Sequence, residues 1–244
     1  MKKLNIIYED KEIIVVNKPS KLLTISDGNT DRTLYSMVSD YVKKQHKSNK
    51  IFIVHRLDKD TSGIVLFAKN EDTKHKLQHN WNSIVKREYI AILDGKLKTK
   101  NGVFKDYLFE DKNHLVRVSD KKTDMYSETE YELINYFSNY TVVLINIKTG
   151  KKNQIRTSFA NIDKPILGDK KYGSKRNNLN RLGLHAYKLT LNYNDKEYIF
   201  ESKIPEEFNK FIIKKGRKVL NGEEVYNKDK QVKKKKKDKK KKHH

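Results

Sequence analysis

The sequence contains no cysteine among its 244 residues, which excludes a disulfide framework and a thiolate metal site. It holds only 3 prolines and 10 glycines, and no stretch is rich enough in Pro, Gly or Ser to form a linker between domains. No apolar run approaches the roughly 20 residues that a membrane-spanning helix needs. Glu9, Asp10 and Glu12 interrupt the apolar stretch that a signal peptide would require. We therefore expect a soluble cytoplasmic protein without a membrane partner.

Acidic residues are scarce relative to basic ones, with 31 Asp and Glu against 54 Lys and Arg and a formal net charge of +23. Residues 228–242 carry a net charge of +9, which leaves +14 on the rest of the chain. Such a field attracts polyanions, with nucleic acid the first candidate and an anionic membrane surface the second. We predict one folded domain over residues 1–213 and a disordered, lysine-rich tail over residues 214–244.

Short apolar runs bounded by turn residues predict strands. These lie at 6–8, 13–16, 51–54, 64–68, 87–93, 115–118, 128–137, 140–147, 182–192 and 197–201. Helical spacing and capping residues predict helices after Thr33, from Asn70 to about Trp81, over 153–160 and from Pro205. The remainder of 96–124 is polar and broken. Hairpins outnumber strand–helix alternations, so we expect an α+β fold with a mainly antiparallel mixed sheet and flanking helices.

Polar residues gather between Val54 and Gly63, directly before the apolar run Ile64–Ala68. The run predicts a buried strand, so the polar residues lie at the mouth of a strand. Reactive groups held on rigid elements are common at such positions. The stretch is therefore the first candidate for a functional site.

A metal site in this stretch does not fit the residues. Four residues occupy positions one, three, five and six of a calcium-binding EF-hand loop: Asp58, Asp60, Ser62 and Gly63. Position twelve, which requires a bidentate glutamate, is Lys69. His75 and His79 share a helix face but lack the glutamate of the zinc protease motif. We predict no bound metal.

Two interpretations of Asp58 remain open on the residues alone. An aspartate before Thr-Ser-Gly commonly closes an Asx-turn, and Asp60 fits that role well. Asp58, however, follows Arg56 in a basic chain, and a carboxylate among cations stays ionised and available as a nucleophile.

The segment His55–Gly63 resembles the signature of the RluA-type pseudouridine synthases. Further blocks resemble that family in the same order along nearly the whole body of the chain. They are Ile7–Asp10 with Val15–Pro19, Lys86–Ala91, Lys148–Arg156, Pro165–Asp169 with Tyr172–Gly173, and Leu184–Ala186.

The resemblance implies an isomerase that converts uridine to pseudouridine in ribosomal or transfer RNA, without cofactor or metal, in a central cleft of the sheet. Asp58 would be the catalytic aspartate and Arg156 the arginine that pairs with it. Tyr89 would stack on the target base and help to remove a proton from its ring, and Arg56 would fill the space that the flipped base leaves. The remaining predicted RNA-binding residues are His55, Lys151, Lys152, Asn153 and Gln154.

Two features depart from the family pattern. The third motif usually has an arginine and a histidine where this chain has Lys151 and Asn153, and lysine cannot hold a phosphate bidentately. The chain also begins at the catalytic body, so we expect it to lack the N-terminal RNA-binding module of many relatives. Substrate capture would then depend on the body and on the lysine-rich tail, which either binds RNA by counterion release or is only a solubilising extension. We expect a monomer.

Two other functions compete with this one. A non-catalytic RNA-binding or ribosome-assembly protein could keep the fold, but it would not need a carboxylate in a basic cleft. A nucleoside glycosidase would also break a glycosidic bond. Such enzymes usually use a second catalytic carboxylate, and a strongly basic body serves no purpose on a small substrate.

Overall fold

The computed structural model describes residues 4–214, 217–220 and 223–226, with their side chains up to residue 212. One sheet of eleven strands forms the body, in the order β1-β2-β4-β10-β5-β9-β8-β6-β7, with β11 paired to β10 and β3 to β4. The strands are β1 (Ile6–Glu9), β2 (Ile13–Lys18), β3 (Phe52–Ile53), β4 (Ser62–Ala68), β5 (Val85–Asp94), β6 (Asn101–Glu110), β7 (Val116–Ser119), β8 (Met125–Phe137), β9 (Tyr140–Ile147), β10 (Leu184–Tyr193) and β11 (Lys196–Glu201).

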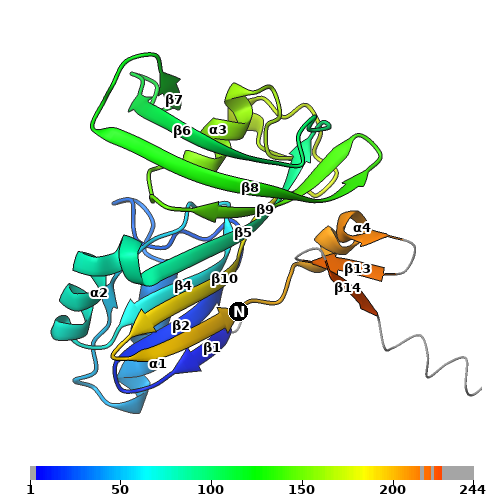
Figure 1. The fold of residues 1–244 in the computed structure, drawn as a ribbon. Helices are drawn as coiled ribbons and strands as arrows, with labels where there is room; N and C mark the ends of the chain where they lie inside the picture. The colour runs from blue at the N-terminus through cyan, green and yellow to red at the C-terminus, as the bar shows by residue number, and fades with distance from the viewer. Residues whose placement is uncertain (1–3, 215–216, 221–222, 227–244) are drawn as a thin grey trace, which may run out of the picture.

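Within the described part of the chain, only β4 and β10 pair in parallel. The predicted fold class, α+β with a mainly antiparallel sheet, is therefore confirmed. Figure 1 shows the sheet as two parts, with β1, β2, β4 and β10 in one and β6, β8 and β9 in the other. Strand β5 joins them, since it pairs with β10 on one side and β9 on the other.

Helices flank the sheet in the described part of the chain, and two of them begin at the predicted caps. The Thr33 side chain caps α1 (Leu34–Gln45) in a capping box with Ser36, and Asn70 caps α2 (Glu71–Ile84). Helix α2 lays Leu77 and Trp81 on one apolar cluster of the core. Helix α3 (Gln154–Asn161) is short and buries almost every residue. Figure 1 places α3 beside β6, β7 and β8.

The most important difference from the predicted elements is β6. Its ten residues fall in the segment predicted to be polar and broken, because only Leu108 among them is buried and the exposed face gives no apolar periodicity. Where a helix was predicted from Pro205, the structure has a 3-10 turn, η2 (Glu206–Phe208), followed by the four-residue helix α4 (Asn209–Ile212).

A small second sheet differs from the predicted tail. Strands β12 (Ile213–Lys214), β13 (Arg217–Leu220) and β14 (Glu223–Tyr226) pair antiparallel where the sequence predicted a disordered extension from residue 214. An Asn-Gly pair separates β13 from β14 in the sequence, which is a strong hairpin signal that the lysine content obscured. Residues 227–244 lie outside the described residues.

The core lies on both faces of the sheet and around the C-terminal helix. The largest cluster joins β2, β4, β5 and β9 to α1 and α3, so it carries the segments that surround the predicted site. None of the helices in the described residues could span a lipid bilayer.

Candidate active site

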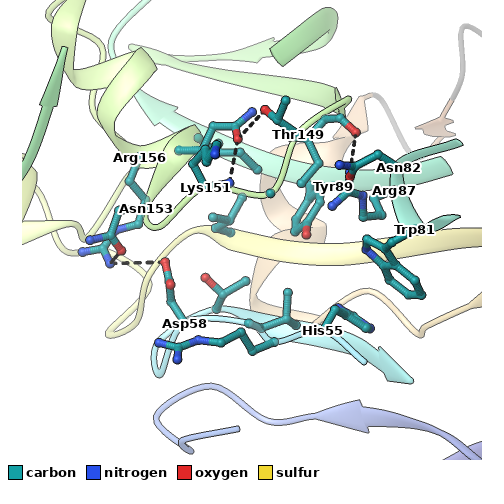
Figure 2. Close-up of a pocket in the computed structure, with 18 of the residues that line it drawn as sticks. His55, Asp58, Trp81, Asn82, Arg87, Tyr89, Thr149, Lys151, Asn153 and Arg156 are labelled. Atoms are coloured by element: carbon teal, nitrogen blue, oxygen red, sulfur yellow. Dashed lines mark hydrogen bonds and ion pairs between the residues drawn. The ribbon is translucent and has the colours of Figure 1, made fainter. Parts of the chain in front are cut away.

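A cavity of about 680 Å³ lies between the two parts of the sheet. One wall is the loop Val54–Thr61 before β4, and the facing wall is the segment Thr149–Arg156, which leads into α3. Figure 2 shows these walls with Asp58 and His55 on one side and Lys151 and Thr149 on the other. Eight of the nine predicted site residues line the cavity: His55, Arg56, Asp58, Tyr89, Lys151, Asn153, Gln154 and Arg156. The ninth, Lys152, lines a smaller hollow that shares Arg56 and Asp58.

The loop that carries Asp58 is held from beneath by the segment that follows β2. The ammonium of Lys18, which is fully buried, donates to the carbonyl oxygens of Lys59 at 3.0 Å and Leu22 at 2.7 Å. Thr24 donates to the carbonyl of Leu57 at 2.8 Å and accepts from its N–H. These contacts fix the backbone on both sides of Asp58.

Gly63 is required where this loop enters β4. Its φ is +117°, and a Cβ there would collide with the backbone of Ala186 on the neighbouring strand β10. The close approach lets Ser62 pair with His185 in the parallel register. The hydroxyl of Ser62 also meets the buried imidazole of His185 at 2.7 Å. The Thr-Ser-Gly part of the motif therefore ties the loop to β10.

Asp58 points toward Arg156, as Figure 2 shows. Oδ2 of Asp58 lies 3.6 Å from Nη1 of Arg156, an ion-pair distance that is longer than a hydrogen bond. Burial raises the pKa of the Asp58 carboxyl, while Arg156, Arg56 and Lys18 oppose this by lowering it. The sequence predicted that pairing would keep Asp58 charged. The cations do favour the charged form, but the net direction is upward because desolvation is larger.

The main partner of Arg156 is Asp169, which the sequence analysis did not single out. The guanidinium donates to both carboxylate oxygens of Asp169, from Nε at 2.7 Å and from Nη2 at 2.8 Å. Nη1 donates to Oδ1 of Asn153 at 3.0 Å, and the ring of Tyr172 lies beneath the group at 4.9 Å. Both residues of the pair are buried, so this bidentate contact fixes the guanidinium that faces Asp58.

Tyr89 lies on β5 with only 7% of its surface exposed. Burial raises the pKa of its phenol to about 12, with a smaller contribution from the charge of Asp58. The ring is therefore neutral at physiological pH and suited to packing against a planar group. It is poorly suited to the proton removal that the resemblance allowed for it.

Three predicted RNA-binding residues make contacts within the protein. His55 accepts the N–H of Leu66 at Nε2 and stacks on Trp81, and burial lowers its pKa to about 3. Gln154 accepts from the Thr149 hydroxyl and the Lys151 N–H, and donates to β8. Asn153, the third, adopts a left-handed φ of 53° and holds Arg156. Their RNA contacts stay predictions.

The remaining predicted RNA-binding residues are cationic and lie at the rim. Arg56 is exposed. The ammonium of Lys151 lies 3.4 Å from the carbonyl of Asp124, and that of Lys152 is 2.7 Å from Oε1 of Glu110. Among the described residues, no group of three or more His, Cys, Asp and Glu side chains could hold a metal ion. The arrangement is a half-buried carboxylate faced by a fixed guanidinium, with cations around the entrance.

Comparison with known proteins agrees with this geometry. Residues 12–161, more than half of the chain, match the family model described as RNA pseudouridylate synthase. An uncharacterised RNA pseudouridine synthase of Bacillus subtilis is 33% identical over 76% of this chain and 63% of its own length. The ribosomal large subunit pseudouridine synthase D of Borreliella burgdorferi is 34% identical over 85% of this chain and 67% of its own. The chain thus spans about two thirds of the length of these relatives.

The fold agrees as well. The human RNA pseudouridylate synthase domain containing 4 superposes with a TM-score of 0.72 at 22% identity, covering 84% of this chain and 92% of its own. The human RNA pseudouridylate synthase domain containing 1 superposes with a TM-score of 0.70 at 18% identity, covering 95% of this chain and 94% of its own. The predicted family is confirmed, and the predicted class of isomerase is the class named for these relatives. This chain belongs to the RNA pseudouridylate synthase family.

Proposed function

We propose that this protein isomerises uridine to pseudouridine in RNA, with Asp58 as the essential carboxylate. The observation that carries the proposal is the pairing of Asp58 with Arg156 at 3.6 Å inside a cavity that also contains Tyr89. A protein that only binds RNA gains nothing from a carboxylate held beside its phosphate-binding cations, because the carboxylate repels the backbone.

The reaction requires the target uridine to leave its stack and enter the cavity. The bond between N1 of uracil and C1′ of ribose breaks while Asp58 engages the nucleotide, and the uracil turns. A new bond forms between C5 and C1′, the proton of C5 leaves, and N1 takes up a proton. Asp58 must act as the carboxylate, so the cations that lower its pKa, above all Arg156, support the step.

The other site residues divide by position. Tyr89, neutral and buried beside Asp58, packs against the flipped base. Arg56, exposed at the entrance, takes the place of the base in the RNA stack. Lys151 and Lys152 attract phosphates at the rim, while Asn153, Gln154 and His55 hold the walls of the cavity in place.

The substrate proposed is ribosomal or transfer RNA. Relatives such as the Borreliella burgdorferi and Nitrosomonas europaea proteins are named for the ribosomal large subunit, and the net charge of +23 suits a large polyanion. Action in the cytoplasm as a monomer is part of this proposal, and so is catalysis without a cofactor or metal.

The direct test compares the wild-type protein with Asp58→Ala on unmodified total RNA, with pseudouridine mapped by reverse-transcription stops after carbodiimide treatment. We expect stops at defined uridines with the wild type and a loss of rate of about 10⁴-fold or more in the variant. Asp60→Asn is the matched control, since it removes the same charge two residues along the loop and should retain activity within a few fold. Equal signal from the wild type and Asp58→Ala would refute the role of Asp58, and RNA binding without product from the wild type would refute the activity.

A further inference from the structure

A second buried arginine, Arg87, lines the same cavity. It lies two residues before Tyr89 on β5, so both side chains project from the same face of the strand about 7 Å apart. Only 6% of its surface is exposed. Figure 2 shows Arg87 beside Asn82 and Tyr89, on the side of the cavity away from Asp58.

The contacts of Arg87 are all with neutral groups. Nη2 donates to Oδ1 of Asn82 at 2.8 Å and to the carbonyl of Lys148 at 3.1 Å, with a longer contact of 3.5 Å to that of Ile147. Nε is buried without an acceptor. Among the described side chains, none supplies a carboxylate within 4.0 Å of this guanidinium.

This arrangement is costly in the free protein. A guanidinium does not lose its proton at physiological pH, so burial cannot neutralise it. A buried cation without a counter-ion is unfavourable, because it has lost its hydration, unless an anion binds beside it. Neutral carbonyl and amide oxygens compensate only part of that cost. The group that would compensate the rest of the charge on Arg87 is an anion.

The cavity has space for an anion at this position. Gly150 lies against the guanidinium, and a Cβ on that residue would sit 2.9 Å from Nη1. The glycine therefore leaves open a volume that any other residue would fill. Asn82, which lines the same end of the cavity, is exposed on the last turn of α2, so this end is open to solvent. At about 680 Å³, the cavity is in the size range that holds a drug-sized ligand, larger than a single pyrimidine ring.

We propose that Arg87, with Gly150 and Asn82 around it, forms a subsite for one backbone phosphate of the RNA next to the target uridine. The inference rests on the proposed function, because that function brings RNA into the cavity. A phosphate is favoured over a uracil carbonyl because only the phosphate supplies the negative charge that the buried guanidinium lacks. The subsite would fix the register of the nucleotide that follows or precedes the flipped base.

The test is a double-mutant cycle that combines Arg87→Gln with modified RNA substrates. In each substrate, a neutral methylphosphonate replaces one charged phosphate near the target uridine. Product formation by the wild type on the unmodified RNA must be shown first, and its absence would refute the proposed function rather than the subsite. With the wild type, we expect one linkage whose neutralisation lowers kcat/KM about tenfold or more. With Arg87→Gln, the same linkage should cost less than twofold, while other sensitive linkages keep their full effect.

Two further variants separate this contact from a structural role. Lys86→Gln removes the same charge from the adjacent, exposed position on the opposite face of β5, where Lys86 pairs with Glu88, and it should retain the full sensitivity of the wild type. Arg87→Lys keeps the charge without the planar fork and should retain part of the sensitivity, even if Arg87→Gln folds poorly in thermal denaturation. Losses that add independently at every linkage would overturn the proposal. A second result would also overturn it. If Arg87→Gln shows no coupling to any phosphate but does show coupling to 2-thiouridine or 4-thiouridine in the target position, Arg87 contacts a uracil carbonyl.

Discussion

Two arginines of similar burial face one cavity, and their surroundings differ completely. Arg156 is 8% exposed and has Asp169 in a bidentate contact, Asp58 at 3.6 Å and Asn153 at Nη1. Arg87 is 6% exposed and has only neutral acceptors within the described part of the chain. The guanidinium of Arg156 therefore has a counter-ion within the protein, whereas that of Arg87 has none among the described residues.

The difference separates two uses of buried charge. A cation that is paired inside the protein has a fixed position before substrate arrives, so it can hold the reacting carboxylate in place. A cation without a counter-ion stores an unfavourable energy that an anionic ligand can relieve. By this criterion, the half of the cavity near Arg156 positions the reacting carboxylate, and the half near Arg87 binds an anionic group of the substrate.

The contrast should be largest in the stability of the free protein. Arg156→Met leaves the buried Asp169 without its partner, so we expect the free energy of unfolding to fall by about 3–5 kcal/mol. Arg87→Met removes an unpaired charge and leaves groups that water can reach at Asn82, so the loss should be below about 1 kcal/mol. Urea unfolding of both variants at one pH and salt concentration gives the comparison. Equal losses would mean that the neutral acceptors compensate Arg87 fully.

A smaller effect is expected in catalysis when the partner of Arg156 is changed. Asp169→Asn keeps the shape of the side chain but loses the charge that fixes the guanidinium, and a displacement of about 1 Å at Asp58 is enough to lower kcat about 10²-fold. Asp163→Asn is the matched control, since Asp163 is exposed just after α3 and should leave kcat unchanged. Single-turnover rates at saturating RNA measure this directly. A wild-type rate in Asp169→Asn would show that Asp58 and Asn153 alone position Arg156.

Much of the fold could be predicted from local sequence. The signal lies within a few residues for the caps Thr33 and Asn70, for the turn between the predicted strands 128–137 and 140–147, and for the buried run Ile64–Ala68. Strand β6 could not be predicted this way, because it is held by pairing with β8 and β7 rather than by an apolar face of its own. Its register exists only once β8 is in place.

The site was predictable to a different degree. The motif around Asp58 and the block that ends at Arg156 identified the two residues that the fold brings to 3.6 Å. Asp169, Lys18 and Arg87 were not singled out, since each acts through a contact that is distant in sequence. The buried position of Lys18 under Lys59, 41 residues away, cannot be inferred from a lysine that precedes a proline.

The smallest effect is expected in the pH dependence of kcat/KM, which distinguishes the half of the cavity near Asp58 from the half near Arg87. Burial raises the pKa of Asp58, so the acid limb of kcat/KM should lie above that of an ordinary aspartate, and activity should be lost as the pH falls through it. Arg56 is among the cations that lower the pKa of Asp58, so Arg56→Gln should move the limb to higher pH, by less than about one unit because Arg56 is exposed. Arg87 is not among those cations, and Arg87→Gln should leave the midpoint in place while it lowers the rate at every pH. A shift of the limb in Arg87→Gln would show that the two halves of the cavity share one electrostatic environment.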